Sequence, residues 1–285
     1  MPHHIEGDKK PIVLDYMQWD NVAPAAAIIS NVEDMSNWLI MQMNEGKYKE
    51  KQILSEDKLW EMHYPQTPES YGKWWTKYLP SKHLNAYGLG WEIFDYHGVK
   101  VVHHGGGADG MLSKTMFVPE KHFGIVILTN DINYFYVAMM YKILDLYLSD
   151  DDFDWSNLYY RFYEYGESKK KADKIEAEKK HIKNTKPTLE LEEYTGTYGG
   201  DLYGDAKVSL NNGKLTVNFI PTPKFVGNLT HWQYNTFKIK LINSPTLPEG
   251  TVNFIINKDG KVSEMRVDVP NPDFDFTELK FMRKK

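Results

Sequence analysis

HHGGGADGM, residues 103–111, is the stretch of sequence that decides the fold. It lies between VKVV at 99–102 and KTMFV at 114–118, two runs typical of strands, and a further strand is predicted at 123–129. Glycines at the edge of an antiparallel sheet let a ligand or another backbone approach closely, and a histidine supplies a donor there. The spacing leaves an alternative open, in which the glycines at 105–107 form a hairpin loop beside a surface histidine.

A longer series of short motifs gives this stretch a family resemblance. YGLGW at 87–91, the glycine-rich run, FVP at 117–119 and a strand ending at Asn130 follow one another in that order. This order resembles the serine β-lactamase and penicillin-binding-protein-like family, in particular its class C-type esterase and peptidase branch. The third motif of that family is Lys-Thr-Gly or His-x-Gly on the strand that lines the active site, and His104-Gly105-Gly106 matches it. The resemblance covers about residues 1–150.

The resemblance implies roles for the matched residues. His104 would be the basic residue of the third motif, which contacts a substrate carboxylate or supports a proton relay. Gly105, Gly106 and Gly107 would line the substrate and oxyanion site, with Gly107 as the best candidate for a backbone N–H donor. The family implies no cofactor for this chemistry.

The same resemblance implies two motifs that this sequence does not supply. The family's nucleophile is the serine of Ser-x-x-Lys, and its second motif is Tyr-x-Asn or Ser-x-Asn, both expected before Pro24. Ser55 and Ser168 each precede a lysine at the right spacing, but a catalytic pair needs a buried serine and a desolvated lysine. Carboxylates directly after Ser55 indicate instead the N-cap of a solvated helix, and Ser168 lies in a lysine run. We therefore expect no nucleophile in the chain.

Two functions follow from these observations. The first is a fragment or truncated relative of a serine hydrolase that transfers acyl groups from β-lactams, peptidoglycan peptides or esters, and is inactive alone. It would take a small-molecule or peptidoglycan-like substrate only if the missing N-terminal half is supplied, so its status as an enzyme stays open. The alternative is a non-catalytic binding protein that uses its C-terminal part. No signal peptide is evident, although the resemblance implies a periplasmic or extracellular location for the full-length parent.

Composition excludes several classes of function. The chain has 285 residues with a net charge of −5, which gives no electrostatic case for nucleic acid. Cysteine is absent, and the pair His3 and His4 has no third ligand at a metal-like spacing, so we expect no metal site. Lys142 and Asp145 interrupt the longest apolar helix candidate, so we expect no membrane span.

The sequence divides into three regions: a partial hydrolase-like domain at 1–150, a charged helical connector at 151–187 and a β-rich domain at 188–285. In the first region, helices are predicted at about 31–44 and 132–148, the former opened by a capping box of Ser30 and Glu33. The connector begins with an aromatic-rich helix at 155–165 and continues as a charged helix at 169–183. The aromatic pair Trp74-Trp75 lies in a looser segment, where it either rims a substrate cleft or pins its own loop.

The last region predicts seven or eight short antiparallel strands. Asn212-Gly213 and Asp259-Gly260 are typical of type I′ hairpin turns between alternating runs. Such a pattern favours a small closed barrel, and it resembles the lipocalin-like domain appended to many β-lactamase-related proteins. We expect His231 to be packed or hydrogen-bonded and not part of a site. The predicted fold class is therefore α+β, with a transpeptidase-like antiparallel sheet and helices followed by a β-barrel.

Overall fold

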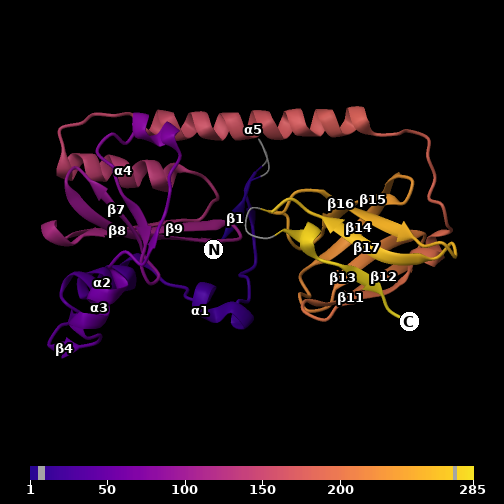
Figure 1. The fold of residues 1–285 in the computed structure, drawn as a ribbon, viewed down its shortest axis with the longest axis horizontal. Helices are drawn as coiled ribbons and strands as arrows, with labels where there is room; N and C mark the ends of the chain where they lie inside the picture. The colour runs from indigo at the N-terminus through magenta and orange to yellow at the C-terminus, as the bar shows by residue number, and fades with distance from the viewer. Residues whose placement is uncertain (6–9, 272–274) are drawn as a thin grey trace. The chain divides into compact units, whose positions relative to one another are not determined.

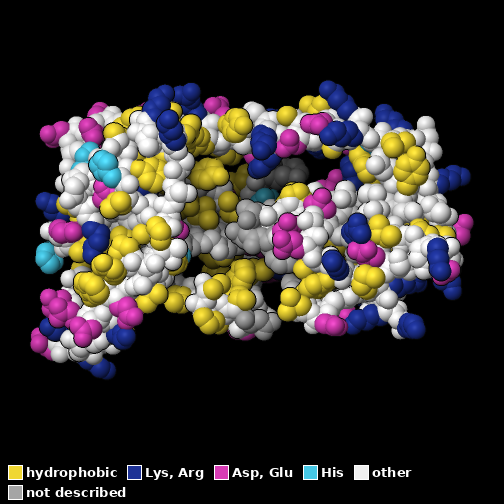
Figure 2. All heavy atoms as spheres, in the orientation of Figure 1, with side chains coloured by type: hydrophobic (Ala, Val, Ile, Leu, Met, Phe, Trp, Pro, Cys, Tyr) yellow, Lys and Arg dark blue, Asp and Glu magenta, His cyan; other side chains and the backbone are white. Residues whose placement is uncertain are grey.

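The computed structural model describes residues 1–5, 10–271 and 275–285. The chain forms two compact units, Met1–Lys169 and Lys170–Lys285, called unit 1 and unit 2 below. Helix α5 (Trp155–Lys180) begins in unit 1 and ends in unit 2 (Figure 1). On the face shown in Figure 2, side chains of both charges are interspersed with hydrophobic ones in each unit. Within the described part of the chain, no helix is both long and apolar enough to cross a membrane.

Unit 1 is built on a six-stranded antiparallel sheet in the order β10-β9-β8-β7-β6-β5. Its strands are β5 (Thr67–Pro68), β6 (Asn85–Tyr87), β7 (Glu92–Tyr96), β8 (Val99–Ala108), β9 (Met111–Val118) and β10 (Phe123–Thr129). Its helices are α1 (Ala23–Ala26), α2 (Val32–Met43), α3 (Glu56–Met62) and α4 (Phe135–Leu148). Two small hairpins, β1 (His3–His4) with β2 (Ile12–Val13) and β3 (Lys47–Tyr48) with β4 (Lys51–Gln52), complete it.

The sheet of unit 1 is covered on both faces (Figure 1). We call the face toward α4 the back face: there Val101, Met116 and Leu144 are fully buried together with Trp155 at the start of α5. The opposite face, called the front face, packs Val102, Phe117 and Trp91 against Leu39 of α2. Because side chains alternate along a strand, neighbouring residues of β8 enter different cores.

Unit 2 is a closed barrel of eight antiparallel strands, as the turn chemistry predicts. The strands are β11 (Gly196–Gly200), β12 (Gly204–Asn211), β13 (Lys214–Phe219), β14 (Val226–Gln233), β15 (Thr236–Leu241), β16 (Gly250–Ile256), β17 (Val262–Asp268) and β18 (Phe281–Arg283). Pairing of β11 with β18 closes the barrel. Inward-facing side chains such as Tyr194, Phe237 and Phe254 are buried and in ring contact with one another, so they fill the interior. The predicted α+β fold class is confirmed.

Three local predictions were wrong in detail. Helix α2 is capped by Asn31, whose side chain accepts from the Asp34 N–H at 3.0 Å, and not by Ser30, because the helix begins one residue later than the capping box required. The two predicted connector helices are one continuous helix, α5, because no proline lies between them and Gly166 keeps the helical conformation. Asp259-Gly260 belongs to a longer loop in which only the glycine has a positive φ, whereas Asn212 and Gly213 both do, as a type I′ turn requires.

Candidate functional site

The glycine run is part of a strand, which excludes the alternative of a glycine hairpin loop. Residues 104–108 of β8 pair with β9 throughout, and the turn comes later, at Asp109-Gly110. Gly110 has φ +74°, and a Cβ there would lie 2.4 Å from the His3 carbonyl oxygen, so this position requires glycine. Pairing with β9 thus holds the glycine run as extended backbone along one side.

The other side of this segment is open. The last pair between β7 and β8 joins Glu92 to His103, so within the described residues β7 does not reach residues 104–108. We call this segment the β8 tip. Although β8 is an inner strand of the sheet, its tip therefore has a free edge. The sequence predicts glycines at a sheet edge, and this is the part of the strand that the prediction concerns.

The peptide groups of the β8 tip alternate between β9 and the free edge. Thr115 Oγ1 donates to the His104 carbonyl oxygen and Ser113 Oγ donates to that of Gly106, both at 3.4 Å from β9, so these two residues face β9. The N–H and C=O of one residue in an antiparallel strand point to the same side, and successive residues point to opposite sides. The N–H groups of Gly105 and Gly107 are therefore directed to the free edge.

His104 is partly buried on the front face and held by two contacts. Its Nδ1 lies 2.6 Å from the Gly105 carbonyl oxygen and its Nε2 lies 3.0 Å from the Tyr87 hydroxyl. A carbonyl oxygen only accepts, so Nδ1 carries a hydrogen, and in the neutral ring Nε2 accepts from the Tyr87 hydroxyl. The neighbouring His103 points to the back face, where it is buried.

Tyr87 was not identified as a site residue from the sequence. The signal was available, since Tyr87 opens the YGLGW motif, but nothing in that motif says that the hydroxyl reaches a histidine 17 positions later. The contact depends on β6 and β8 lying on either side of the short strand β7. Only the sheet order brings the two residues together.

The two serines at the Ser-x-x-Lys spacing lie on exposed helices. Ser55 precedes α3 without a side-chain capping bond, and Lys58 forms a 2.7 Å ion pair with Glu61 that raises the pKa of the lysine. A raised pKa opposes a role as general base. Ser168 is exposed on α5 and is followed by three lysines. Within the described part of the chain neither serine forms a hydrogen bond with the β8 tip, and both are exposed, whereas the chemistry requires burial.

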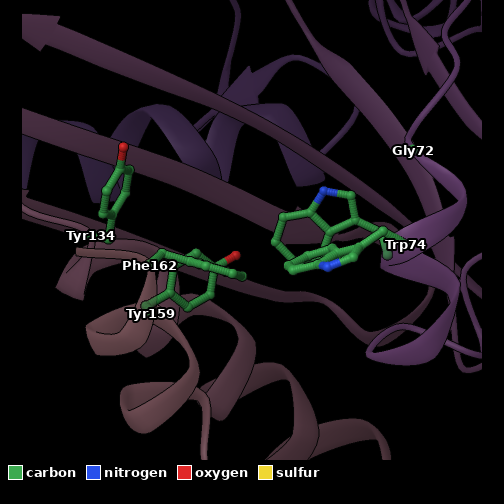
Figure 3. A pocket seen from close by; sticks show the side chains of 6 residues that line it. Gly72, Trp74, Tyr134, Tyr159 and Phe162 are labelled. Carbon is green, nitrogen blue, oxygen red and sulfur yellow. The ribbon is translucent and has the colours of Figure 1, made fainter. Parts of the chain in front are cut away.

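The aromatic pair Trp74-Trp75 contributes to a pocket of about 490 Å³ in unit 1. Three further aromatic side chains, Tyr134, Tyr159 and Phe162, line it, and Gly72 completes the lining (Figure 3). The rings lie against one another, with centroids 5.1 Å apart for Trp74 and Phe162. His104 and the glycines of the β8 tip do not line this pocket. The rings thus pin their own loop onto α5 and leave a shallow aromatic hollow beside it.

No metal centre is evident in the part of the chain that the structure describes: no three His, Asp or Glu side chains there lie close enough to share an ion. The groups that the site presents are backbone N–H donors, an imidazole and a phenol. These groups suit the binding of an acyl oxygen and the movement of a proton.

Comparison with known families agrees with this arrangement. Residues 3–139 match the family model described as beta-lactamase, and residues 180–283 match a domain of unknown function, DUF3471. The first match contains the β8 tip and Tyr87, and the second contains the barrel.

Two curated relatives and a solved structure are similar to the chain. The chain is 27% identical to an unguisins hydrolase of Aspergillus campestris over 207 residues, which are 64% of this chain. It is 29% identical to an unguisins hydrolase of Aspergillus violaceofuscus over 146 residues, which are 46% of this chain. These matches span 34% and 25% of the relatives' lengths. The octameric penicillin-binding protein homologue from Pyrococcus abyssi aligns with 89% of this chain and 47% of its own at 15% identity and a TM-score of 0.36.

Proposed function

The chain belongs, through residues 3–139, to the beta-lactamase family of hydrolases, and from this premise we propose that the β8 tip is the substrate-binding wall of a serine acyl-transfer site. The observation that carries the proposal is the free edge of the tip, which presents glycine N–H groups beside an imidazole. The substrate class is a β-lactam, a peptidoglycan-like peptide or an ester, because each has a carbonyl whose oxygen becomes negative during acyl transfer.

The oxyanion would be bound by the tip. An oxyanion hole needs N–H donors fixed about 2.7–3.1 Å from the oxygen before the reaction starts. The Gly107 N–H is directed to the free edge and is held by pairing of the strand with β9. Glycines at 105, 106 and 107 leave no side chain between the substrate and this donor. The nucleophile's own N–H would be the second donor.

His104 would bind the substrate or relay a proton. Its Nδ1–H is engaged by the Gly105 carbonyl, which fixes the ring plane and leaves Nε2 for exchange with Tyr87. The phenol and imidazole thus form a short proton path at the β8 tip. A substrate carboxylate that displaced the Tyr87 hydroxyl would accept from Nε2–H of a protonated ring.

The nucleophile would come from outside residues 1–285. Ser55 and Ser168 lack the burial that catalysis requires, and the 285-residue chain is therefore proposed to be inactive by itself. Acyl transfer would need a polypeptide segment that presents Ser-x-x-Lys and Tyr-x-Asn to the free edge. The expected periplasmic or extracellular location of the full-length parent stays a prediction.

The alternative function, a binding protein that uses the barrel, has less support. A barrel of eight strands is just wide enough for side chains to fill it or for one small ligand. Here inward-facing aromatic residues occupy the interior. We therefore favour the β8 tip over the barrel as the functional part of the chain.

A binding experiment tests the proposal. The imidazole signals of the whole chain would be followed by NMR during titration with benzylpenicillin and with a peptide ending in D-alanyl-D-alanine. We expect the His104 signals to move, whether or not those of His103, one residue away on the opposite face, move with them. The substitution Tyr87→Phe should shift the His104 Nε2 signal before any ligand is added, because it removes the hydroxyl partner.

Movement of the His103 signals alone, or of neither histidine at millimolar ligand, would contradict the proposal. Two matched variants sharpen the test. Substitution of His104 by Gln should abolish the ligand-induced shifts of the glycine amides at 105–107. Substitution of His103 by Gln should leave those shifts in place.

A further inference from the structure

The back face of the sheet carries ionisable side chains directly behind the β8 tip. Glu92 of β7 pairs with His103 of β8, and Lys114 of β9 pairs with Gly105, so the three side chains share one face. Lys82, in the loop before β6, joins them with its Nζ 4.4 Å from the centre of the Phe94 ring. We call Lys82, Glu92, His103 and Lys114 the back-face cluster.

Lys114 is held over the backbone of the tip. A Cβ on Gly105 would be in ordinary van der Waals contact with Lys114 Nζ, at 3.6 Å, so the ammonium group lies beside the backbone of the tip. The Lys114 side chain is only 11% exposed, and its ion-pair partner is Glu92, at 4.0 Å. Burial lowers the pKa of Lys114, and the charge of Glu92 only partly opposes this.

Among the described residues Lys82 forms no ion pair with a carboxylate. Burial lowers its pKa to about 8, against the opposing charges of Glu92, Asp95 and Glu69, while the charge of Lys114 lowers it further. Asp95 is engaged elsewhere, 2.8 Å from His83 Nδ1, and Glu69 accepts from Asn85 Nδ2 at 2.9 Å. A pKa of about 8 leaves Lys82 mostly protonated at pH 7.

The cluster therefore contains two ammonium groups and a single near carboxylate. The Glu92 carboxylate also lies near His103, with 3.7 Å between His103 Nε2 and Glu92 Oε2. Burial, followed by the charges of Lys114 and Lys82, holds the pKa of His103 well below its usual range, so its ring is neutral at pH 7. Its buried Nδ1 has no hydrogen-bond partner among the described residues.

An excess of positive charge in the partly buried back-face cluster is unfavourable in free energy. A buried ionic group needs a partner of opposite charge and hydrogen bonds to offset its lost hydration. A second carboxylate would accept from both ammonium groups and restore neutrality. The cluster reaches solvent at Glu92, whose side chain is 35% exposed, and at Lys82, which is half-buried.

We infer that the back-face cluster is a carboxylate-binding site, in which Lys82 and Lys114 hold the anion on the side of the sheet opposite His104. The carboxylate belongs either to a small organic acid or to an Asp or Glu side chain of a second copy of the chain. This site is separate from the proposed acyl-transfer wall and does not depend on it.

The test uses the whole chain and acetate as the probe. The side-chain signals of Lys82 and Lys114 would be titrated with pH by heteronuclear NMR in sodium acetate and in sodium chloride at equal ionic strength. We expect acetate to raise the pKa of Lys82 by about 1 unit or more, since an opposite charge within about 4–6 Å produces shifts of that size. The His103 ring signals should move in the same titration.

Variants assign the binding to the two lysines. Lys114→Gln and Lys82→Gln should each weaken acetate binding about tenfold, as expected for loss of one charged hydrogen bond. Lys121→Gln, on an exposed turn of unit 1, is the matched control and should bind acetate as the unchanged chain does. The titration of the unchanged chain stands by itself if a variant does not fold.

Protein concentration distinguishes the two sources of the carboxylate. A rise of the Lys82 pKa with acetate in dilute protein supports a small acid as the ligand. A rise with protein concentration in chloride alone supports a carboxylate from a second copy. Identical titrations of both lysines in acetate and chloride, at every protein concentration, would overturn the inference.

Discussion

The two units differ in how their strands end. Every strand of the unit 2 barrel has a neighbour on each side, and its aromatic core fills the interior. In unit 1 the described strand β10 pairs only with β9, and the β8 tip extends past β7. The ionisable groups of the two proposed sites also lie in unit 1: His104, His103 and Lys114 are on or beside that tip. Unsatisfied backbone edges and unbalanced charges mark the part of the molecule suited to binding, whereas the closed barrel is suited to stability.

Proteolysis should separate the two units most visibly. The barrel has local strand pairing, so we expect it to fold alone, and the second half of α5 is exposed and rich in lysine. Limited digestion with trypsin should leave a stable C-terminal fragment of about 100 residues, a typical domain size. Mass spectrometry of the digest would identify it. Loss of the whole chain without this fragment would remove the contrast between the units.

A buried carboxylate should control the stability of unit 1 alone. Asp145 is 1% exposed and accepts from the Tyr96 hydroxyl and from Trp155 Nε1, both at 2.5 Å. Asp145→Ala would leave two buried donors unpaired, at a cost of about 2–6 kcal/mol, since each orphan costs about 1–3 kcal/mol. Urea unfolding followed by tryptophan fluorescence reports mainly on unit 1, because Trp232 is the single tryptophan outside it.

The control for this substitution is Asp152→Ala. Asp152 pairs with Lys142 at the surface, so its loss should leave the urea midpoint unchanged. Equal midpoints for the Asp145 variant and the unchanged chain would show that the Tyr96 and Trp155 donors find other partners.

Acid should weaken unit 1 through two buried histidines. Burial, with a smaller effect of Lys100, lowers the pKa of His63 to about 4, and burial holds that of His103 well below its usual value. Both bind protons more readily when unfolded, so stability is lost as the pH falls from about 6.5 toward the folded values. The slope should reach up to about 1.4 kcal/mol per pH unit for each histidine.

Urea unfolding between pH 7 and pH 4 measures this slope. The double variant His63→Gln and His103→Leu should lose most of it, because neither replacement takes up a proton in this range. A slope as steep in the double variant as in the unchanged chain would assign the acid sensitivity to other groups.

Much of the fold follows from local sequence signals, but the site does so only in part. Asn212-Gly213 and the alternating runs predict the barrel because hairpins are local structures. The strands 114–118 and 123–129 were likewise predicted and lie within β9 and β10. The contact of Tyr87 with His104 was not foreseen, since it depends on which strands become neighbours across the sheet.

The extent of β8 shows the same limit. Three glycines in sequence are as compatible with a loop as with a strand, and pairing with β9 decides between them. Likewise, nothing local shows that Lys82 would approach Lys114 from a distant loop. Roles that rest on His104, Gly105, Gly106 and Gly107 stay proposals until a ligand is observed at the β8 tip.

The central claim is that this chain supplies the wall of an acyl-transfer site without its nucleophile. The most direct measurement is intact-mass analysis of the chain after incubation with a fluorescent penicillin and with an activated ester. We expect no adduct, because the chain supplies no nucleophile. We also expect no turnover above buffer: well-studied enzymes that lose their nucleophile retain about 10³–10⁴ of acceleration through binding and an oxyanion hole, and here the N–H donor of the nucleophile is missing as well. A stoichiometric adduct on Ser55 would contradict the claim.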